Sequence, residues 1–354
     1  MTDHLFSPLK IRSLTLRNRI GVSPMCQYSA EDGFINDWHV VHLGSRAVGC
    51  AGLVMMEATG VTPAGRISPG CTGIWDDAHV APLRRMTDFI KQHGAAAGIQ
   101  IAHAGRKASM GLSWKGGGRL LPDNGGWETL APSAIPFQPE HPPPKEMTVE
   151  DITKLADDFS GAAQRAVRAG FQVIELHGAH GYLLHEFFSP LSNKRSDQYG
   201  GSLENRGRLM LDLASRLRSE LPEDIVLGAR LSCVDWIEGG ITIEDSIWLA
   251  SELKKRGVDF IDCSSGNVVP NEKIPFGPGY QLPFAQEIRQ KAGITTAAVG
   301  FITDAQQADA IIREGSADMV FLARAMLRDP YWPIHAARQL GAAAGIPNQY
   351  LRGY

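Results

Sequence analysis

The chain has 354 residues, of which 44% are hydrophobic, a length that permits either one large barrel domain or two smaller domains. Lys and Arg total 35 while Asp and Glu total 38, and this formal net charge of -3 without long runs of one sign argues against nucleic acid or an anionic membrane as a partner. The N-terminus lacks the apolar segment of a signal peptide, and no apolar run long enough to span a membrane follows, so we expect a cytoplasmic protein.

Eight short apolar runs have the composition of buried strands. In chain order they cover residues 20–22, 53–57, 99–102, 173–176, 226–231, 260–263, 296–299 and 319–322. Five intervening segments carry apolar residues at helical spacing, and they cover residues 80–93, 152–169, 203–220, 243–256 and 305–314. The chain therefore alternates strands with helices.

Residues at the predicted helix ends support this alternation. Glycines stand where four helices should stop, and Thr242 and Asp304 stand where two should start; the glycines are Gly94, Gly170, Gly257 and Gly315. Eight strand–helix repeats favour one closed (β/α)8 TIM barrel over residues 1–354, with an open doubly wound sheet plus a small domain as the alternative. Residues 104–148, rich in Gly and Pro, interrupt the alternation of strands and helices and are predicted to form a lid-like insertion.

The five cysteines are odd in number, widely spaced and free of a C-x-x-C pair. This pattern favours neither a disulfide framework nor a zinc site. Three of them lie in or beside strand-like runs and are interpreted as buried packing residues. Only Cys26, which follows Ser23-Pro24-Met25 at the end of the first strand, is a candidate for the functional site.

Barrel enzymes place their chemistry at the carboxyl ends of the strands, where hydrogen-bond donors outnumber carboxylates in this sequence. Gly300 ends the seventh strand and Ala323-Arg324 ends the eighth, the positions where barrels commonly bind a phosphate. Arg230 on the fifth strand has no carboxylate partner evident from the sequence, which suggests that it pairs with a negatively charged group of a ligand.

The fourth strand ends in His177-x-x-His180, with Tyr182 two residues further on. A metal site is one reading, but the pair lies at a strand end without a third ligand nearby. Two core histidines bonded to backbone are another reading. We favour two imidazole donors directed at one substrate oxygen, with Tyr182 as a proton donor.

Several of these segments resemble the Old Yellow Enzyme family of ene-reductases, in particular the bacterial group typified by YqjM and xenobiotic reductase A. The resemblance extends from Leu5-Phe6 to the C-terminus. Its most specific pieces are residues 23–28 (SPMCQY), 98–107 (GIQIAHAGRK), 131–133 (APS), 177–182 (HGAHGY), 186–193 (EFFSPLSN) and 199–202 (YGGS).

The resemblance implies an NAD(P)H dehydrogenase that holds FMN noncovalently and takes its electrons from NADH or NADPH. By this analogy the enzyme reduces an activated C=C bond in an α,β-unsaturated carbonyl compound or maleimide, or a nitro compound, by hydride transfer from flavin N5 and protonation at the α-carbon. His177 and His180 would grip the substrate oxygen, and Tyr182 would supply the proton. The implied flavin contacts are Ser23, Pro24, Met25, Ala58, Gln100, Arg230, Gly300, Ala323 and Arg324.

Further roles also follow only from the resemblance. Cys26 would tune the flavin potential, and Tyr28 would reach the substrate oxygen from the opposite side. Residues 341–354 would lie at a subunit interface, with Arg352 entering the neighbouring active site of a homodimer or homotetramer. The chain departs from the group in having Ala323 instead of Gly, Tyr354 instead of Trp, and a longer lid loop over residues 111–128, which affects the expected substrate range.

Two rival functions fit the sequence less well. A dienoyl-CoA reductase-like enzyme has a similar barrel, but it continues into further domains and needs clustered cysteines for an iron–sulfur centre, which this sequence lacks. A noncatalytic flavin-binding protein would have no need of the oxygen clamp formed by His177, His180 and Tyr182.

Overall fold

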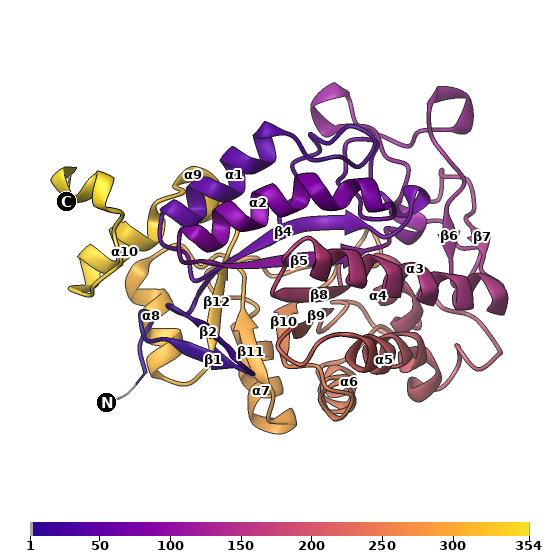
Figure 1. The fold of residues 1–354 in the computed structure, drawn as a ribbon. Helices are drawn as coiled ribbons and strands as arrows, with labels where there is room; N and C mark the ends of the chain where they lie inside the picture. Colours follow the sequence, from indigo (N-terminus) through magenta and orange to yellow (C-terminus); the bar gives the residue numbers. More distant parts are fainter. Residues whose placement is uncertain (1–2, 354) are drawn as a thin grey trace.

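Eight parallel strands close into a barrel in the computed structural model, which describes residues 3–353 (Figure 1). Val320 pairs with Ile20, and this contact between the last strand and the first closes the ring. The closed barrel is therefore confirmed, and the alternative of an open sheet is wrong. In order around the ring, the strands are β3 (Ile20–Val22), β4 (Leu53–Gly60), β5 (Ala96–Ala102), β8 (Val173–Gly178), β9 (Val226–Ser232), β10 (Phe260–Ser264), β11 (Thr295–Ala298) and β12 (Met319–Leu322).

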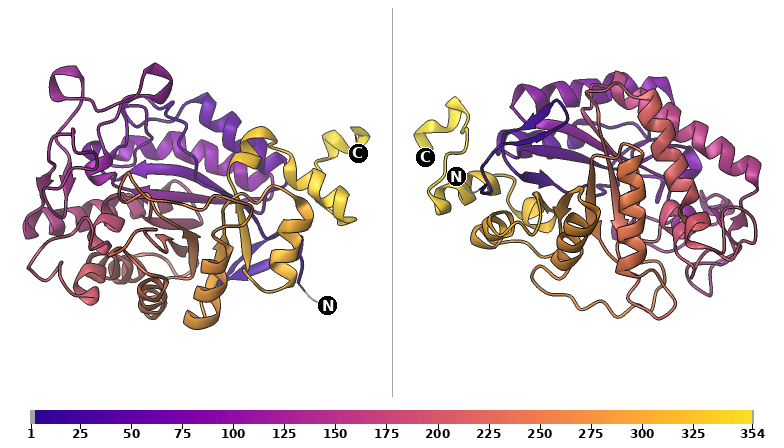
Figure 2. Two further views of the ribbon diagram at one scale, coloured as in Figure 1. Left: turned by 180° about the vertical axis from the view of Figure 1, so that it is seen from behind. Right: turned by 90° about the horizontal axis from the view of Figure 1, so that it is seen from below.

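Helices cover the outside of the barrel, as the two further views show (Figure 2). Five of them occupy the predicted segments to within a few residues: α2 (Val80–Gln92), α3 (Val149–Arg168), α5 (Leu203–Glu220), α6 (Ile243–Lys255) and α8 (Ala305–Arg313). The helices that were not predicted are α1 (Asp37–Val48), α4 (Leu183–Phe188), α7 (Leu282–Ala292), α9 (Arg324–Arg328) and α10 (Trp332–Leu340).

The apolar pattern of the sequence does not predict helix α1, because the buried face of this helix is partly polar. His39, His42 and Arg46 all point inward from this helix, which breaks the apolar periodicity. The Arg46 guanidinium donates hydrogen bonds to the backbone carbonyls of His42 and Met326. The two terminal nitrogens of the buried guanidinium thus have backbone acceptors that the sequence pattern does not reveal, while Nε is buried without a partner among the described residues.

The predicted helix boundaries are confirmed by backbone geometry. Thr242 and Asp304 accept hydrogen bonds from the backbone N–H groups three residues further on, as N-cap side chains do. The four glycines at helix ends adopt φ values of 75°, 85°, 82° and 70°, in chain order, which suit glycine at this position; they are Gly94, Gly170, Gly257 and Gly315.

The amino-terminal mouth of the barrel is filled with apolar side chains. Several of these belong to the first residues of strands, including Leu53, Val173 and Phe260. An N-terminal hairpin of β1 (Leu9–Ile11) and β2 (Leu14–Leu16) contributes Ile11 and Leu16 to the same cluster. Because this end is sealed by packing, a ligand has access only at the carboxyl ends of the strands.

The segment between β5 and α3 contains three single turns of 3-10 helix, η3 (Gly105–Lys107), η4 (Ser113–Lys115) and η5 (Pro122–Asn124), and a two-stranded sheet of β6 (Leu130–Ala131) and β7 (Lys145–Glu146). Part of it projects from the barrel beside β6 and β7 (Figure 1). The Arg66 guanidinium lies 5.2 Å from the ring centroids of both Trp75 and Trp127, and the Trp127 indole donates a hydrogen bond to the Ala64 carbonyl. These contacts tie the insertion to the loop after β4.

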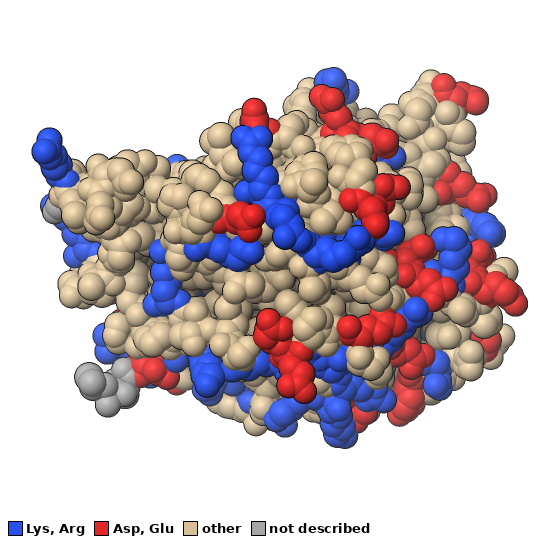
Figure 3. Space-filling view, in the orientation of Figure 1, with Lys and Arg blue, Asp and Glu red and all other residues tan. Residues whose placement is uncertain are grey.

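Charges of both signs are interspersed on the face shown in Figure 3, without a field dominated by Lys and Arg. No helix within residues 3–353 combines the length and apolar character needed to cross a membrane. All five cysteines are free, and four of them are buried, namely Cys50, Cys71, Cys233 and Cys263.

Candidate active site

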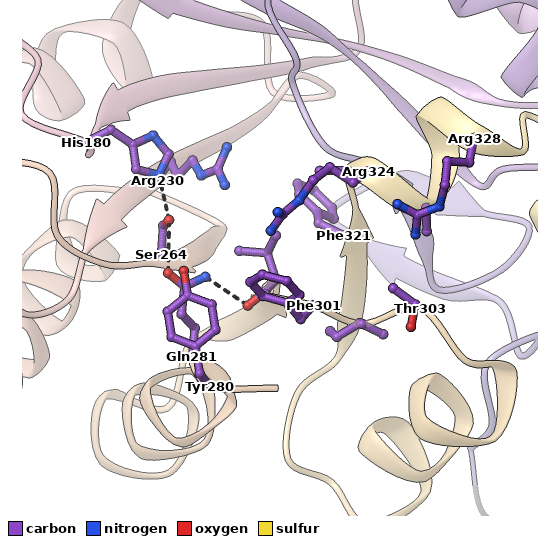
Figure 4. Close-up of a pocket in the computed structure, with 15 residues that line it drawn as sticks. His180, Arg230, Ser264, Tyr280, Gln281, Phe301, Thr303, Phe321, Arg324 and Arg328 are labelled. Atoms are coloured by element: carbon purple, nitrogen blue, oxygen red, sulfur yellow. Dashed lines mark hydrogen bonds between the residues drawn. The ribbon is translucent and has the colours of Figure 1, made fainter. Parts of the chain in front are cut away.

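A cavity of about 240 Å³ opens at the carboxyl ends of the strands (Figure 4). Five of the residues predicted from the sequence line it: His180, Arg230, Gly300, Ala323 and Arg324. Lining residues that the prediction missed include Tyr280, Gln281, Phe301 and Arg328. Tyr280 and Gln281 come from the irregular segment before α7, so strand periodicity gave no signal for them. Arg328 could have been found, because it lies one helical turn beyond Arg324.

His177, His180 and Tyr182 form one cluster. The two imidazole rings have centroids 5.3 Å apart, and the Tyr182 ring lies 5.0 Å from His177. His177 Nδ1 is buried and has no hydrogen-bond partner among the described residues. An unpartnered buried polar atom is costly unless a ligand completes its bonding, so this nitrogen is available to a substrate oxygen.

Burial, followed by the positive charge of Arg230, lowers the pKa of both His177 and His180 well below the ordinary value. Both side chains are therefore neutral imidazoles at physiological pH, and each retains one N–H donor. Burial raises the pKa of Tyr182 well above that of a free phenol, and the neighbouring Cys26 and Tyr28 add to the rise. The site is thus lined by neutral proton donors.

His180 is held in place from both sides. Its backbone N–H donates to Ser232 Oγ at 2.9 Å, and its Nε2 lies 2.6 Å from Ser264 Oγ. Ser264 in turn contacts Gln281, whose amide donates to the Val299 carbonyl at 3.0 Å. The contact to Ser264 shows that His180 is not a core histidine bonded to backbone through its ring. The part of the chain that the structure describes contains no group of three His, Cys, Asp or Glu side chains arranged to hold a metal ion.

The premise that Arg230 lacks a carboxylate partner is wrong. Arg230 Nε lies 3.0 Å from Asp262 Oδ2, and the Asp262 side chain is fully buried on β10. The register of the barrel explains the pairing, because Arg230 on β9 stands directly opposite Asp262 on β10. The pairing could not be read from positions 32 residues apart in sequence, where Asp262 appears inside an apolar run.

A second buried carboxyl group, Glu175 on β8, belongs to the same layer of the barrel. It accepts a hydrogen bond from the Gln100 amide at 2.7 Å. Burial raises the pKa of Glu175, and the nearby Asp262 carboxylate raises it further, so that Glu175 carries a proton at neutral pH. Gln100, Glu175, Arg230 and Asp262 thus form a polar layer beneath the mouth of the barrel.

The far end of the cavity is cationic. Arg324 and Arg328 line it and form no ion pair with any residue between positions 3 and 353, while the Arg324 guanidinium lies 4.1 Å from the ring centroid of Phe301. Gly300 has φ 124°, and a Cβ there would lie 3.0 Å from the Gln281 amide nitrogen. Two uncompensated guanidinium groups beside such a glycine suit a phosphate group.

Cys26 and Tyr28 lie in the loop after β3, near Tyr182. Burial raises the pKa of the Cys26 thiol well above its ordinary value, and the neighbouring Cys71 and Glu57 add to the rise. Cys26 is therefore a thiol rather than a thiolate. Tyr28, at φ 49°, faces Trp114 of the segment between β5 and α3, with ring centroids 6.2 Å apart.

The remaining predicted flavin contacts lie on neighbouring strands. Ser23 follows β3 and donates its backbone N–H to the Leu322 carbonyl at 3.0 Å, with Pro24 and Met25 next in the chain. Ala58 is buried in β4 at an irregularity in its pairing with β5. The structure thus places these residues on β4 or just after β3, and these two strands lie between β12, which leads to Arg324, and β5, which carries Gln100.

Arg352 lies outside the cavity of its own chain, in the C-terminal segment. It is exposed in η6 (Asn348–Gly353), and this C-terminal segment projects away from the barrel (Figure 1). The segment contacts the main body through Tyr350, whose hydroxyl group lies 3.2 Å from that of Tyr331. Tyr354, the departure noted at the C-terminus, lies outside the described residues.

Taken together, the residues present fit a flavin mononucleotide. A cavity with free guanidinium groups at one end suits the phosphate, and a buried cation with an adjacent amide, Arg230 and Gln100, suits the polar edge of an isoalloxazine ring. His177 Nδ1 remains a buried polar atom without a partner among the described residues, and a substrate oxygen could satisfy it.

Comparisons with known proteins point to a flavin-dependent family. Residues 4–342 match the NADH:flavin oxidoreductase / NADH oxidase family. An NADPH dehydrogenase from Geobacillus thermodenitrificans (strain NG80-2) is 48% identical over 356 residues, which is 100% of this chain and 99% of that protein. Morphinone reductase superposes with a TM-score of 0.80 at 29% identity, covering 97% of this chain and 91% of that one. 2-Naphthoyl-CoA reductase gives a TM-score of 0.86 at 26% identity over 97% of this chain, which spans about half (53%) of that structure.

Proposed function

The chain belongs to the NADH:flavin oxidoreductase / NADH oxidase family and is an FMN-dependent NADPH oxidoreductase of the Old Yellow Enzyme type, and we propose that it reduces electron-poor C=C bonds. The substrates of this proposal are α,β-unsaturated carbonyl compounds, maleimides and nitro compounds. One observation carries it: two neutral imidazoles and a phenol converge beside the cavity, with His177 Nδ1 lacking a partner among the described residues.

His177 and His180 bind the carbonyl or nitro oxygen of the substrate. Hydrogen bonds from two fixed N–H donors polarise this oxygen and withdraw electron density from the β-carbon. As the reaction proceeds, negative charge collects on the same oxygen, so the two hydrogen bonds strengthen towards the transition state. Because Ser264 and Ser232 hold His180 in place, this donor needs little reorganisation during the reaction.

Tyr182 donates a proton to the α-carbon. Its phenol remains protonated through the neutral range because burial raises its pKa. FMN, when bound, supplies the two-electron transfer from NADPH or NADH to the substrate. Gln100 and Arg230 would hold the pyrimidine edge, Gly300, Ala323, Arg324 and Arg328 would hold the phosphate, and Ser23, Pro24, Met25, Cys26 and Ala58 would line the ring.

The test separates the two halves of the cycle by stopped-flow absorbance of the FMN-loaded enzyme. We expect the variant H177N/H180N to be reduced by NADPH at nearly the wild-type rate. Its reoxidation by an enone should be slower by about 100-fold, the usual effect of removing donors from an oxyanion site. Equal slowing of both half-reactions would refute the proposal that His177 and His180 bind the substrate oxygen. His93→Asn is the matched control, because its imidazole contacts the Phe89 carbonyl and ring at the end of α2.

We also propose that two copies of the chain associate through the C-terminal segment. Leu351 is 57% exposed on η6, and this segment projects beyond the body of its own chain (Figure 2). An exposed apolar side chain on a projecting segment is typical of a segment that packs against a partner. In such a homodimer, or a tetramer built from it, Arg352 would reach the neighbouring active site.

A further inference from the structure

Lys107 lies at the junction of three loops around the proposed active site. It is the last residue of η3, in the loop after β5. Its ammonium donates to the His180 carbonyl at 2.7 Å, in the loop after β8, and to the Asn267 carbonyl at 3.1 Å, in the loop after β10. No carboxylate forms an ion pair with Lys107 within residues 3–353.

Both acceptor residues have unusual backbone geometry. His180 has φ 61° and Asn267 has φ 73°, in the left-handed region that residues other than glycine rarely adopt. The loops are in direct contact there, because a Cβ on Gly181 would lie only 2.1 Å from the Asn267 carbonyl oxygen. Lys107 thus bridges two strained turns, one of which carries the His180 imidazole.

The same ammonium lies over the proposed proton donor. Lys107 Nζ is 5.1 Å from the ring centroid of Tyr182 and 4.5 Å from that of Phe137. A cation over an aromatic face is attracted to the electron density of the ring. The attraction is stronger for a phenolate, which carries a full negative charge, than for the neutral phenol.

We propose that Lys107, held over Tyr182 by its hydrogen bonds to the two turns, is a positioning residue that supports protonation by stabilising the phenolate that Tyr182 becomes. This inference rests on the proposed function. In the step concerned, the O–H bond of Tyr182 breaks, and its proton forms a C–H bond with the α-carbon of the substrate enolate or nitronate. Water then returns a proton to the phenolate, so no oxidant or reductant is involved.

The charge state of Lys107 agrees with such a role. Burial lowers its pKa to about 8; Arg106 lowers it as well, while Glu186 and Glu272 oppose the fall. Since lysine is charged below its pKa, the ammonium is present at neutral pH and is lost as the pH rises through about 8. The groups that face Lys107 from the surrounding elements are Arg106 on η3, His177 on β8, His180 and Tyr182 after β8, Glu186 on α4, and Glu272 after β10.

The experiment is a double-mutant cycle on the FMN-loaded enzyme, with Lys107→Met and Tyr182→Phe alone and combined. The rate of reoxidation by an enone is measured in single turnovers. We expect Lys107→Met to slow this step by about 5- to 20-fold and to raise its solvent isotope effect, with the rate of reduction by NADPH unchanged. In the Tyr182→Phe background the same substitution should change the rate by less than about 2-fold.

Lys107→Arg is the conservative variant, since it retains the charge and the donors, and it should recover most of the wild-type rate. Equal slowing by Lys107→Met in both backgrounds would overturn the inference, because it would show that the lysine only holds the loops. If Tyr182→Phe alone leaves reoxidation unchanged, the proposed proton donor fails, and the role of Lys107 fails with it. In the wild type, the rate of reoxidation should fall as the pH rises and Lys107 loses its proton near pH 8. Lys107→Arg should lack this fall, and a pH profile shared by both proteins would contradict the proposal.

Discussion

Arg230 and Asp262 form a buried ion pair on neighbouring strands of the barrel, with 3.0 Å between Arg230 Nε and Asp262 Oδ2. The carboxylate offsets the positive charge that Arg230 would present to a reduced, anionic flavin. We therefore expect Asp262→Asn to stabilise the reduced form and to raise the flavin midpoint potential by roughly 30 to 60 mV. Spectroelectrochemical titration of the FMN-loaded protein measures this shift.

Glu175→Gln is the matched control for that experiment. Because Glu175 already carries a proton at neutral pH, replacing it with an amide leaves the charge of the layer unchanged. The midpoint potential should then stay close to that of the wild type. A lower potential in Asp262→Asn, or equal shifts in both variants, would show that the ion pair does not set the potential.

The free guanidinium groups at the end of the cavity lead to a prediction about cofactor affinity. Replacing Arg324 or Arg328 with Ala should weaken FMN binding by about 10- to 100-fold, since each removes a charge-assisted hydrogen bond to the phosphate. Riboflavin, which lacks the phosphate, should bind wild type and variants alike. Fluorescence titration of the apoprotein measures both affinities. Equal losses for FMN and riboflavin would place the arginines elsewhere than at the phosphate.

Gly181 should tolerate no side chain. It combines φ 69° with the close approach of the Asn267 carbonyl oxygen, 2.1 Å from the position of a Cβ. We expect Gly181→Ala to reduce the free energy of unfolding by about 2 to 5 kcal/mol. Gly201→Ala should cost only about 1 kcal/mol, because Gly201 has φ 80° but no atom within 4 Å of a Cβ. Urea unfolding of the FMN-saturated proteins compares the two, and similar costs would show that the contact with Asn267 is unimportant.

The proposed exchange of Arg352 between subunits can be tested by complementation. Arg352→Ala and H177N/H180N homodimers are each expected to be impaired. Mixing them under conditions that exchange subunits should restore activity, because one site of the hybrid would combine intact histidines with the intact Arg352 of the other chain. If Arg352 acted within its own chain, or not at all, mixing would give no more than the average of the two variants.

The local sequence pattern determined the strands, the helix ends and part of the site. Buried parallel strands are short apolar runs, and β3 and β12 have the predicted boundaries. Gly257 and Thr242, which border α6, were identified from their residue types because helix ends have specific backbone requirements. Since the carboxyl ends of barrel strands converge, the sequence assigns His180, Gly300 and Arg324 to one site, and all three line the same cavity.

Tertiary structure alone decided which charges meet. The pairing of Arg230 with Asp262 depends on the register between β9 and β10, and the position of Lys107 over Tyr182 depends on the contact of three loops. Neither relationship leaves a periodic trace in the sequence, because the partners lie far apart along the chain. Residue types specify the strands and their ends, whereas the distances that set charge and proton affinity arise only when the ring closes.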